Sequence, residues 1–355
     1  MFKFALGALV SLLFALASSS AGAAHGAAHG ASVQKKHGLK RVKAGARQQS
    51  VRVVAESGER RVKRVIVVRG KRRVVYQRVT SVVIAAKPTM GDLAGLNLTR
   101  DPLDLKSSVA LVLDQSNSEV LFEKNANVAL PIASITKMMT GLVVVEARQD
   151  MDEMLTITDE DVDRAKFSSS RLKVGSELTR ANMLHIALMS SENRAASALG
   201  RNYPGGLPAF VDAMNAKART LGMADTRYVD SNGLSKQNVA SARDLAKLAI
   251  AAFRQPLLRQ FSTDPKAIVE ASGHPMQFGN TNHLVANPGW DIGLQKTGFI
   301  NEAGRCLLMQ AVIEGRAVIM VFLDSKGKQS RTADAGRMRK WLEALKPAGM
   351  SLPGG

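Results

Sequence analysis

The sequence predicts a mixed α/β (α+β) domain in which one sheet is assembled from both ends of the folded segment and the helices between them form a second subdomain. Two strand-like segments, 108–113 and 119–123, come first and are separated by a polar turn. Residues 157–261 are mostly helical in pattern, because apolar pairs recur there at helical spacing. Three strand-like segments and a helix follow, at 294–297, 306–313, 317–323 and 332–345. We expect the functional site in the cleft between the sheet and the helical subdomain.

Residues 1–23 have the features of a signal peptide. Lys3 gives a short positive region, residues 4–17 are apolar, and Ala21-Gly22-Ala23 offers a cleavage site of small residues. The alternative is an uncleaved membrane anchor, although the apolar run is shorter than the ~20 residues that a bilayer span needs. We therefore expect export, with the periplasm as the compartment if the source is Gram-negative.

Residues 24–100 form a basic, low-complexity linker or arm. Of the net charge of +19, most lies in 35–78, where 16 lysines and arginines face two acidic residues. Valine alternates with arginine and lysine from 51 to 84, and a hairpin is expected around 65–76. The segment is either a solvated basic leader or an arm that binds a polyanion: a cell-wall polymer, an anionic lipid or, with the least support, nucleic acid. Tyr76 stands alone there, without the aromatic interleaving of nucleic-acid binders.

Ser134-Ile-Thr-Lys137 is the first of three short motifs. At the start of a helix, side chains three residues apart share one face, and the helix dipole favours negative charge near Ser134. Lys137 can act as a base if burial lowers its pKa. Taken alone, the motif is weak evidence, because a helix cap followed by a surface lysine is its usual explanation.

Ser191-Glu192-Asn193 and Lys296-Thr297-Gly298 are the other two motifs. The first lies between two expected helices, and the second lies on an expected strand ahead of Phe299. Alone, they are typical of a polar helix junction and of a strand that ends at a turn glycine. In this order and at this wide spacing, the three motifs together are typical of penicillin-binding proteins and serine β-lactamases.

With these motifs, residues 103–345 resemble low-molecular-mass penicillin-binding proteins, specifically the D-alanyl-D-alanine carboxypeptidases and endopeptidases. The resemblance implies a penicillin-binding transpeptidase/β-lactamase-like fold, with an antiparallel sheet flanked by helices and a helical subdomain. It places a DD-peptidase catalytic domain at 101–347, followed by a tail at 348–355.

The resemblance also implies the catalytic roles. Ser134 is acylated by a D-alanyl peptide, Lys137 takes its proton, and Ser191 relays a proton to the leaving amine. The backbone N–H groups of Ser134 and Phe299 form the oxyanion hole. The implied substrates are peptidoglycan peptides, β-lactam antibiotics are implied as covalent inhibitors, and neither a metal nor a cofactor is needed.

Four further residues are implied to bind the substrate. Asn193 orients the substrate amide, Lys296 keeps the site electropositive, the Thr297 hydroxyl binds a carboxylate, and Gly298 allows close approach.

Within the DD-peptidases, we expect the endopeptidase branch, which cuts D-alanyl–diaminopimelate cross-links. The sequence stops about ten residues after its last expected helix, and segment 296–306 looks most like that branch. A carboxypeptidase is the first alternative. A class A β-lactamase is disfavoured because no glutamate lies between Glu192 and Glu270, where its deacylating residue is expected. A non-catalytic wall-binding protein is the remaining alternative.

Other hydrolase classes have little support in the sequence. A Ser-His-Asp triad lacks its nucleophile elbow, and His185 falls on an apolar helix face, as a core histidine does. A metal hydrolase lacks its H-E-x-x-H motif. Cys306, the only cysteine, is expected to be a buried hydrophobe.

Overall fold

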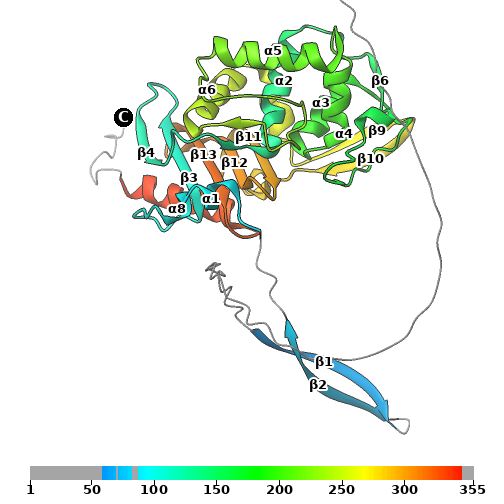
Figure 1. Cartoon of the computed structure of the whole chain (residues 1–355), viewed down its shortest axis with the longest axis vertical. Coiled ribbons are helices and arrows are strands. Elements are labelled where there is room, and N and C mark those ends of the chain that lie inside the picture. The colour runs from blue at the N-terminus through cyan, green and yellow to red at the C-terminus, as the bar shows by residue number, and fades with distance from the viewer. Residues whose placement is uncertain (1–57, 69–70, 82–86, 346–355) are drawn as a thin grey trace, which may run out of the picture. The chain divides into compact units, whose positions relative to one another are not determined.

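The computed structural model describes residues 58–68, 71–81 and 87–345, and the chain divides into two compact units, Met1–Val82 and Val83–Gly355. In the first unit, strands β1 (Gly58–Val68) and β2 (Lys71–Ser81) pair antiparallel along their whole length (Figure 1). The pairing confirms the hairpin expected in this region. The expected signal peptide and the linker before residue 58 lie outside the described residues.

The second unit is built on a five-stranded antiparallel sheet with the strand order β11-β12-β13-β3-β4. The strands are β3 (Ser107–Asp114), β4 (Val120–Lys124), β11 (Asp291–Ile300), β12 (Gly304–Ile313) and β13 (Arg316–Ser325). The first and last parts of the folded segment thus share one sheet, as expected. Strand β11 is at an edge of this sheet, so among the described residues no strand pairs with its outer side.

Strand β3 is buried on both faces, which explains why its sequence is a nearly continuous apolar run. Because side chains alternate along a strand, Val109 and Leu111 join the core beneath the helical subdomain. Ala110 and Val112 join a second core on the opposite face of the sheet. One strand therefore ties both cores to a single sheet.

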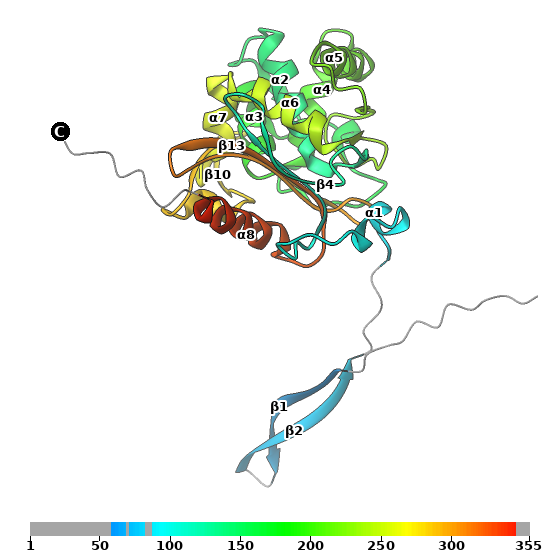
Figure 2. The ribbon, with the colours of Figure 1, turned by 90° about the vertical axis from the view of Figure 1, so that its left-hand side faces the viewer.

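Helices cover both faces of this sheet (Figure 2). Helix α8 packs on β12 and β13 and shares the second core with them, whereas the other long helices lie on the opposite face. The long helices are α2 (Thr136–Glu146), α3 (Arg180–Met189), α4 (Asn193–Arg201), α5 (Gly206–Thr220), α6 (Ala242–Phe253), α7 (Pro256–Thr263) and α8 (Ser330–Ala344). No helix in the described ranges is long and apolar enough to cross a membrane.

Short elements complete the second unit. These are α1 (Met90–Leu93), β5 (Leu130–Pro131), β6 (Met154–Thr156), β7 (Glu177–Thr179), β8 (Val239–Ala240), β9 (Lys266–Ala271), β10 (His274–Gly279), and the 3-10 turns η1 (Leu96–Leu98), η2 (Ala133–Ile135), η3 (Asp159–Asp161) and η4 (His283–Ala286). The hairpin of β9 and β10 is not predicted from the sequence. Residues 162–176 have no regular structure, although this part was expected to be mostly helical.

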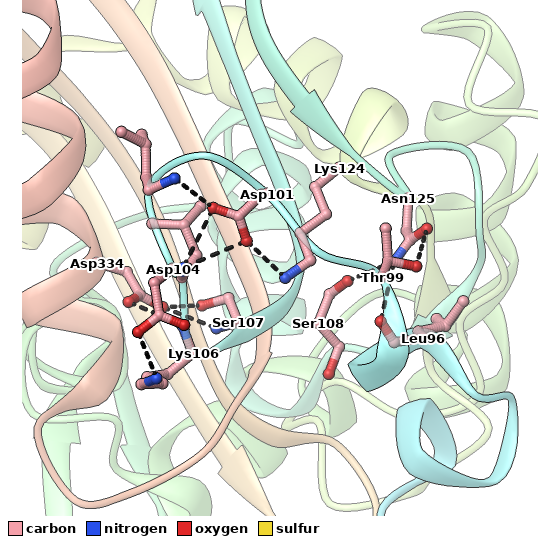
Figure 3. A network of polar contacts seen from close by, with 12 residues as sticks. Leu96, Thr99, Asp101, Asp104, Lys106, Ser107, Ser108, Lys124, Asn125 and Asp334 are labelled. Atoms are coloured by element: carbon pink, nitrogen blue, oxygen red, sulfur yellow. Dashed lines mark hydrogen bonds and ion pairs between the residues drawn. The ribbon is translucent and has the colours of Figure 1, made fainter.

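A buried polar network attaches the segment before β3 to the sheet (Figure 3). The Asp334 carboxylate of α8 accepts hydrogen bonds from the backbone N–H groups of Lys106 and Ser107, at 3.1 and 2.8 Å. Asp101 pairs with Lys124 at 2.9 Å, and both side chains are almost fully buried. The compact unit also includes α1 and η1, so it extends upstream of the expected boundary at residue 101.

Candidate active site

Ser134 lies in the tight turn η2, directly before helix α2. The preceding residue, Ala133, has a φ of +49°, which is a costly conformation for a residue with a side chain. Two glycines hold the other side of this turn. A β-carbon on Gly233 would be 2.1 Å from the Ala133 carbonyl oxygen, and one on Gly298 would be 3.1 Å from the Ser134 nitrogen. The candidate nucleophile Ser134 is therefore held between the backbone at Gly233 and the backbone at Gly298. Both lie so close to its turn that only glycine fits at these positions.

Lys137 is fully buried and points at Ser134. Its Nζ donates to Ser134 Oγ at 2.9 Å, to Asn193 Oδ1 at 2.7 Å and to the Asn232 carbonyl at 2.5 Å. Burial lowers the pKa of Lys137 to about 7, although the Asp230 and Glu192 carboxylates oppose the shift. A neutral amine is therefore accessible near neutral pH, beside the hydroxyl that it would deprotonate.

The second motif lies at the junction of α3 and α4. Ser191 has a φ of +63°, which turns its hydroxyl toward Lys296, whose Nζ lies 3.0 Å from Ser191 Oγ. Asn193 is the first residue of α4, and its Oδ1 accepts the hydrogen bond from Lys137 Nζ. Ser191 and Asn193 thus each contact one of the two buried lysines.

The third motif lies on the edge strand β11. Lys296 is fully buried and also donates to the Thr297 carbonyl at 2.9 Å. Burial, followed by the nearby cations of Lys137 and Arg331, holds the pKa of Lys296 well below its usual range. The Thr297 hydroxyl lies 2.7 Å from the Thr281 hydroxyl, which gives the cleft a pair of adjacent hydroxyl groups.

One cleft of about 400 Å³ brings the three motifs together. Its walls include Ser134, Ser191, Asn193, Thr297 and Gly298. Lys137 and Lys296 lie beneath its floor, in contact with Ser134 and Ser191. The alternative interpretation of Lys137 as a surface lysine is wrong, because its side chain has no exposed area.

Comparison with known proteins agrees with this geometry. The sequence profile of the D-alanyl-D-alanine carboxypeptidase peptidase family matches residues 97–327. The chain belongs to this family. It is 49% identical to the D-alanyl-D-alanine endopeptidase of Pseudomonas aeruginosa over 74% of this chain and 84% of that one. The identity to the Escherichia coli K12 endopeptidase is 45%, over 68% and 79% of the two chains.

The fold of this DD-peptidase family member matches solved structures as well. The Streptomyces K15 DD-transpeptidase superposes with a TM-score of 0.64 and 26% identity, over 70% of this chain and all of that one. The fold and the activity class expected from the sequence are confirmed: a serine DD-peptidase with the penicillin-binding fold.

The structure adds the loop after α5 to the site. The Asp230 carboxylate accepts hydrogen bonds from the N–H groups of Asn232, Gly233 and Ser235, at 3.1, 2.6 and 2.9 Å. This turn presents the Asn232 carbonyl to Lys137. The segment Asp230-Ser-Asn-Gly-Leu resembles the family in sequence, but only the fold reveals that it contacts the buried lysine.

Arg331 also lines the cleft, and no sequence signal points to it. It comes from the first turn of α8 and donates from Nη1 to the Gly298 carbonyl at 2.9 Å. This hydrogen bond fixes the last residue of the Lys-Thr-Gly motif from helix α8, which packs on the face of the sheet opposite the helical subdomain. A single arginine in a helix that carries several basic residues has no local pattern that distinguishes it.

The histidine and cysteine that the sequence set aside lie elsewhere. His185 stacks on Phe261 with ring centroids 4.4 Å apart, and its Nε2 lies 2.9 Å from Asp264 Oδ2. Cys306 is buried in β12, and burial raises the pKa of its thiol to about 12. Neither side chain lines the cleft.

Proposed function

We propose that the chain is a D-alanyl-D-alanine endopeptidase that cuts peptidoglycan cross-links through an acyl-enzyme on Ser134. The observation that carries this proposal is the 2.9 Å contact between Ser134 Oγ and the buried Nζ of Lys137, whose pKa is lowered to about 7. A serine hydroxyl is a weak nucleophile by itself, and a neutral amine at hydrogen-bond distance supplies the missing base.

Acylation then proceeds as follows. Ser134 Oγ attacks the D-alanyl carbonyl carbon while its proton passes to Lys137 Nζ. The carbonyl oxygen becomes an oxyanion, which the backbone N–H groups of Ser134 and Phe299 stabilise. Preorganised donors of this kind contribute about 2.7–4 kcal/mol each in comparable enzymes. Gly298 directly precedes Phe299, and a β-carbon on it would stand 3.1 Å from the Ser134 nitrogen.

Collapse of the tetrahedral intermediate breaks the peptide bond and leaves an ester on Ser134. Lys137 gives up the proton that it took, and the Ser191 hydroxyl, which Lys296 contacts at 3.0 Å, relays it to the leaving amine. Thr297 binds the carboxylate of the leaving residue. Asn193 orients the substrate amide and Lys137. Water then hydrolyses the ester and restores the Ser134 hydroxyl.

The choice of endopeptidase rests on the two relatives above, which carry that name and match this chain over most of their length. Purified chain is to be incubated with cross-linked dimeric muropeptides and with monomeric pentapeptides, and Ser134→Ala serves as the control. Conversion of dimers to monomers supports the endopeptidase. Release of D-alanine from pentapeptide with intact dimers would instead assign a carboxypeptidase.

Binding of β-lactams follows from the same site. Such a ring presents a strained amide to Ser134 and a carboxylate to Thr297, so attack forms an ester but leaves the departing amine attached. The lack of a glutamate between Glu192 and Glu270 removes the residue that a class A β-lactamase uses to hydrolyse this ester. The acyl-enzyme should therefore persist.

We also propose that residues 1–23 direct the chain to the periplasm, where cross-linked peptidoglycan lies. The charged, apolar and small-residue regions of this segment support the proposal. Mass spectrometry of the mature N-terminus in a periplasmic extract tests it. An intact residue 1 on a membrane-bound chain would instead support a retained anchor.

The basic arm at 35–78 is proposed to bind a polyanionic surface of the cell envelope. The excess of 16 lysines and arginines over two acidic residues in this arm supports the proposal, and the hairpin register sets Arg61 opposite Arg78. Binding to vesicles of anionic and of neutral lipid tests the proposal. A variant with four arginines changed to glutamine should lose binding to anionic vesicles: Arg61, Arg72, Arg73 and Arg78.

A further inference from the structure

A second hollow, of about 600 Å³, adjoins the catalytic cleft and shares Phe299 and Asn301 with it. We call it the basic groove. Its lining includes four cationic side chains and not one acidic side chain: Lys87, Arg305, Lys326 and Lys328. Phe299 forms the lip between the two hollows, and its side chain is 51% exposed.

Three of these four cations have no partner acid among the described residues. Lys326 is neutralised, since it pairs with Asp92 at 2.6 Å and with Asp324 at 3.1 Å. Lys87 and Lys328 are exposed, and neither forms an ion pair within the described part of the chain. The Arg305 guanidinium lies 4.7 Å above the Phe299 ring, a contact that leaves its charge available.

The proposed chemistry gives the direction in which a substrate runs past Phe299. The leaving-group carboxylate lies at Thr297 and the reacting carbonyl lies between the N–H groups of Ser134 and Phe299. The acyl part of the peptide must then continue along the free edge of β11, past Phe299 toward Asn301. Residues upstream of the scissile bond therefore reach the basic groove.

A competing hollow lies beyond Lys166, on the side of the helical subdomain. Its lining includes five acidic residues and three basic ones: Glu160, Asp161, Asp163, Asp230 and Glu302, against Arg164, Lys166 and Lys236. Lys166 forms an ion pair with Glu302 and separates this hollow from the cleft. Because its carboxylates outnumber its cations, this hollow attracts a substrate carboxylate less than the basic groove does.

We propose that the basic groove is a subsite for an acidic residue on the acyl side of the scissile bond, so that the enzyme prefers acidic stem peptides. This inference rests on the proposed function. Exposed cations each contribute modestly, so we expect a total preference of about 5- to 20-fold in kcat/KM. Since exposed charges are screened, the preference should shrink as salt is raised.

The test uses two synthetic cross-linked peptides that contain a D-alanyl–diaminopimelate bond and differ only in one residue on the acyl side of that bond, which carries either a free carboxylate or its amide. The readout is the ratio of the two kcat/KM values for the full-length chain. The double variant Lys87→Gln, Lys328→Gln should bring this ratio close to one. Lys340→Gln, an exposed lysine of α8 outside the groove, should keep the wild-type ratio.

Three results would overturn the inference: equal rates for the two peptides with wild type, a preference for the amide, or a ratio that survives in the double variant. Failure of the proposed function looks different. In that case wild type cleaves neither peptide and takes up no penicillin. Cleavage of both peptides at one rate, with normal penicillin uptake, would overturn the subsite assigned to the basic groove and leave the proposed function in place.

Discussion

Gly233 lies so close to Ala133 that a β-carbon at position 233 would stand 2.1 Å from the Ala133 carbonyl oxygen. The loop that carries Gly233 is fixed by Asp230 and also presents the Asn232 carbonyl to Lys137. One turn therefore supports the nucleophile and orients its base. The rigidity of this site comes from backbone packed on backbone rather than from side chains alone.

Gly233→Ala should therefore damage both stability and catalysis. Its φ of +82° is strained for alanine, and the Ala133 carbonyl has to move, so we expect a loss of about 2–4 kcal/mol in the free energy of unfolding. Gly222→Ala is the matched control, because its φ is +68° but nothing lies within 4 Å. That control should cost only about 1–2 kcal/mol. Chemical denaturation and the penicillin acylation rate measure the two effects; equal losses in both variants contradict the close fit proposed for Gly233.

The acylation rate should rise with pH through about 7 and then level off. Lys137 acts as a base only when neutral, and burial lowers its pKa to about 7, so protonation below this value removes the base. The Glu192 carboxylate raises that pKa, so Glu192→Gln should move the acid limb to lower pH. Stopped-flow acylation from pH 5 to 9 measures the shift. A limb that stays in place, or moves upward, argues against Lys137 as the base.

Arg331→Met should slow acylation about 10- to 100-fold with little change in Tm. The lost hydrogen bond leaves the Gly298 carbonyl without its partner 2.9 Å away, and the end of β11 can then move relative to Ser134. Loss of this cation also raises the pKa of Lys296. Arg339→Met, on the same helix but outside the cleft, serves as the control. Similar rates for both variants would show that Arg331 does not position the site.

Asp334→Ala should destabilise the fold by about 3–5 kcal/mol, because the buried N–H group of Ser107 and the partly buried one of Lys106 lose their acceptor (Figure 3). Acylation by the fraction that remains folded should match wild type, since Asp334 is outside the cleft. Asp104→Asn, at an exposed ion pair with Lys106, should leave the denaturation midpoint near that of wild type. A midpoint unchanged in Asp334→Ala contradicts the role of this network.

Much of this architecture could be predicted from the sequence because its signals are local. The strands of the sheet are apolar runs bounded by turns, and the motifs at Ser134, Ser191 and Lys296 are short. The order of these motifs and their spacing along the chain identify them as parts of one site. The hairpin of β9 and β10 was missed, because its exposed positions include the apolar Ile268 as well as Pro275 and so break the alternation of apolar and polar residues expected of a half-buried strand.

Other parts of the site depend on contacts that no local pattern encodes. Arg331 reaches Gly298 across the sheet, and Asp230 acts through backbone N–H groups of its own loop. The strained φ values of Ala133 and Ser191 oppose local preference and persist because the surrounding backbone enforces them. Tertiary packing determines these features, so they become visible only in the fold.

The most direct test of the central claim is intact-protein mass spectrometry of the purified chain after incubation with benzylpenicillin, with peptide mapping of the adduct. The predicted result is one persistent acyl adduct on Ser134, absent from a folded Ser134→Ala variant. No adduct on folded wild-type protein, or an adduct on another residue, would contradict the proposed acyl-enzyme mechanism.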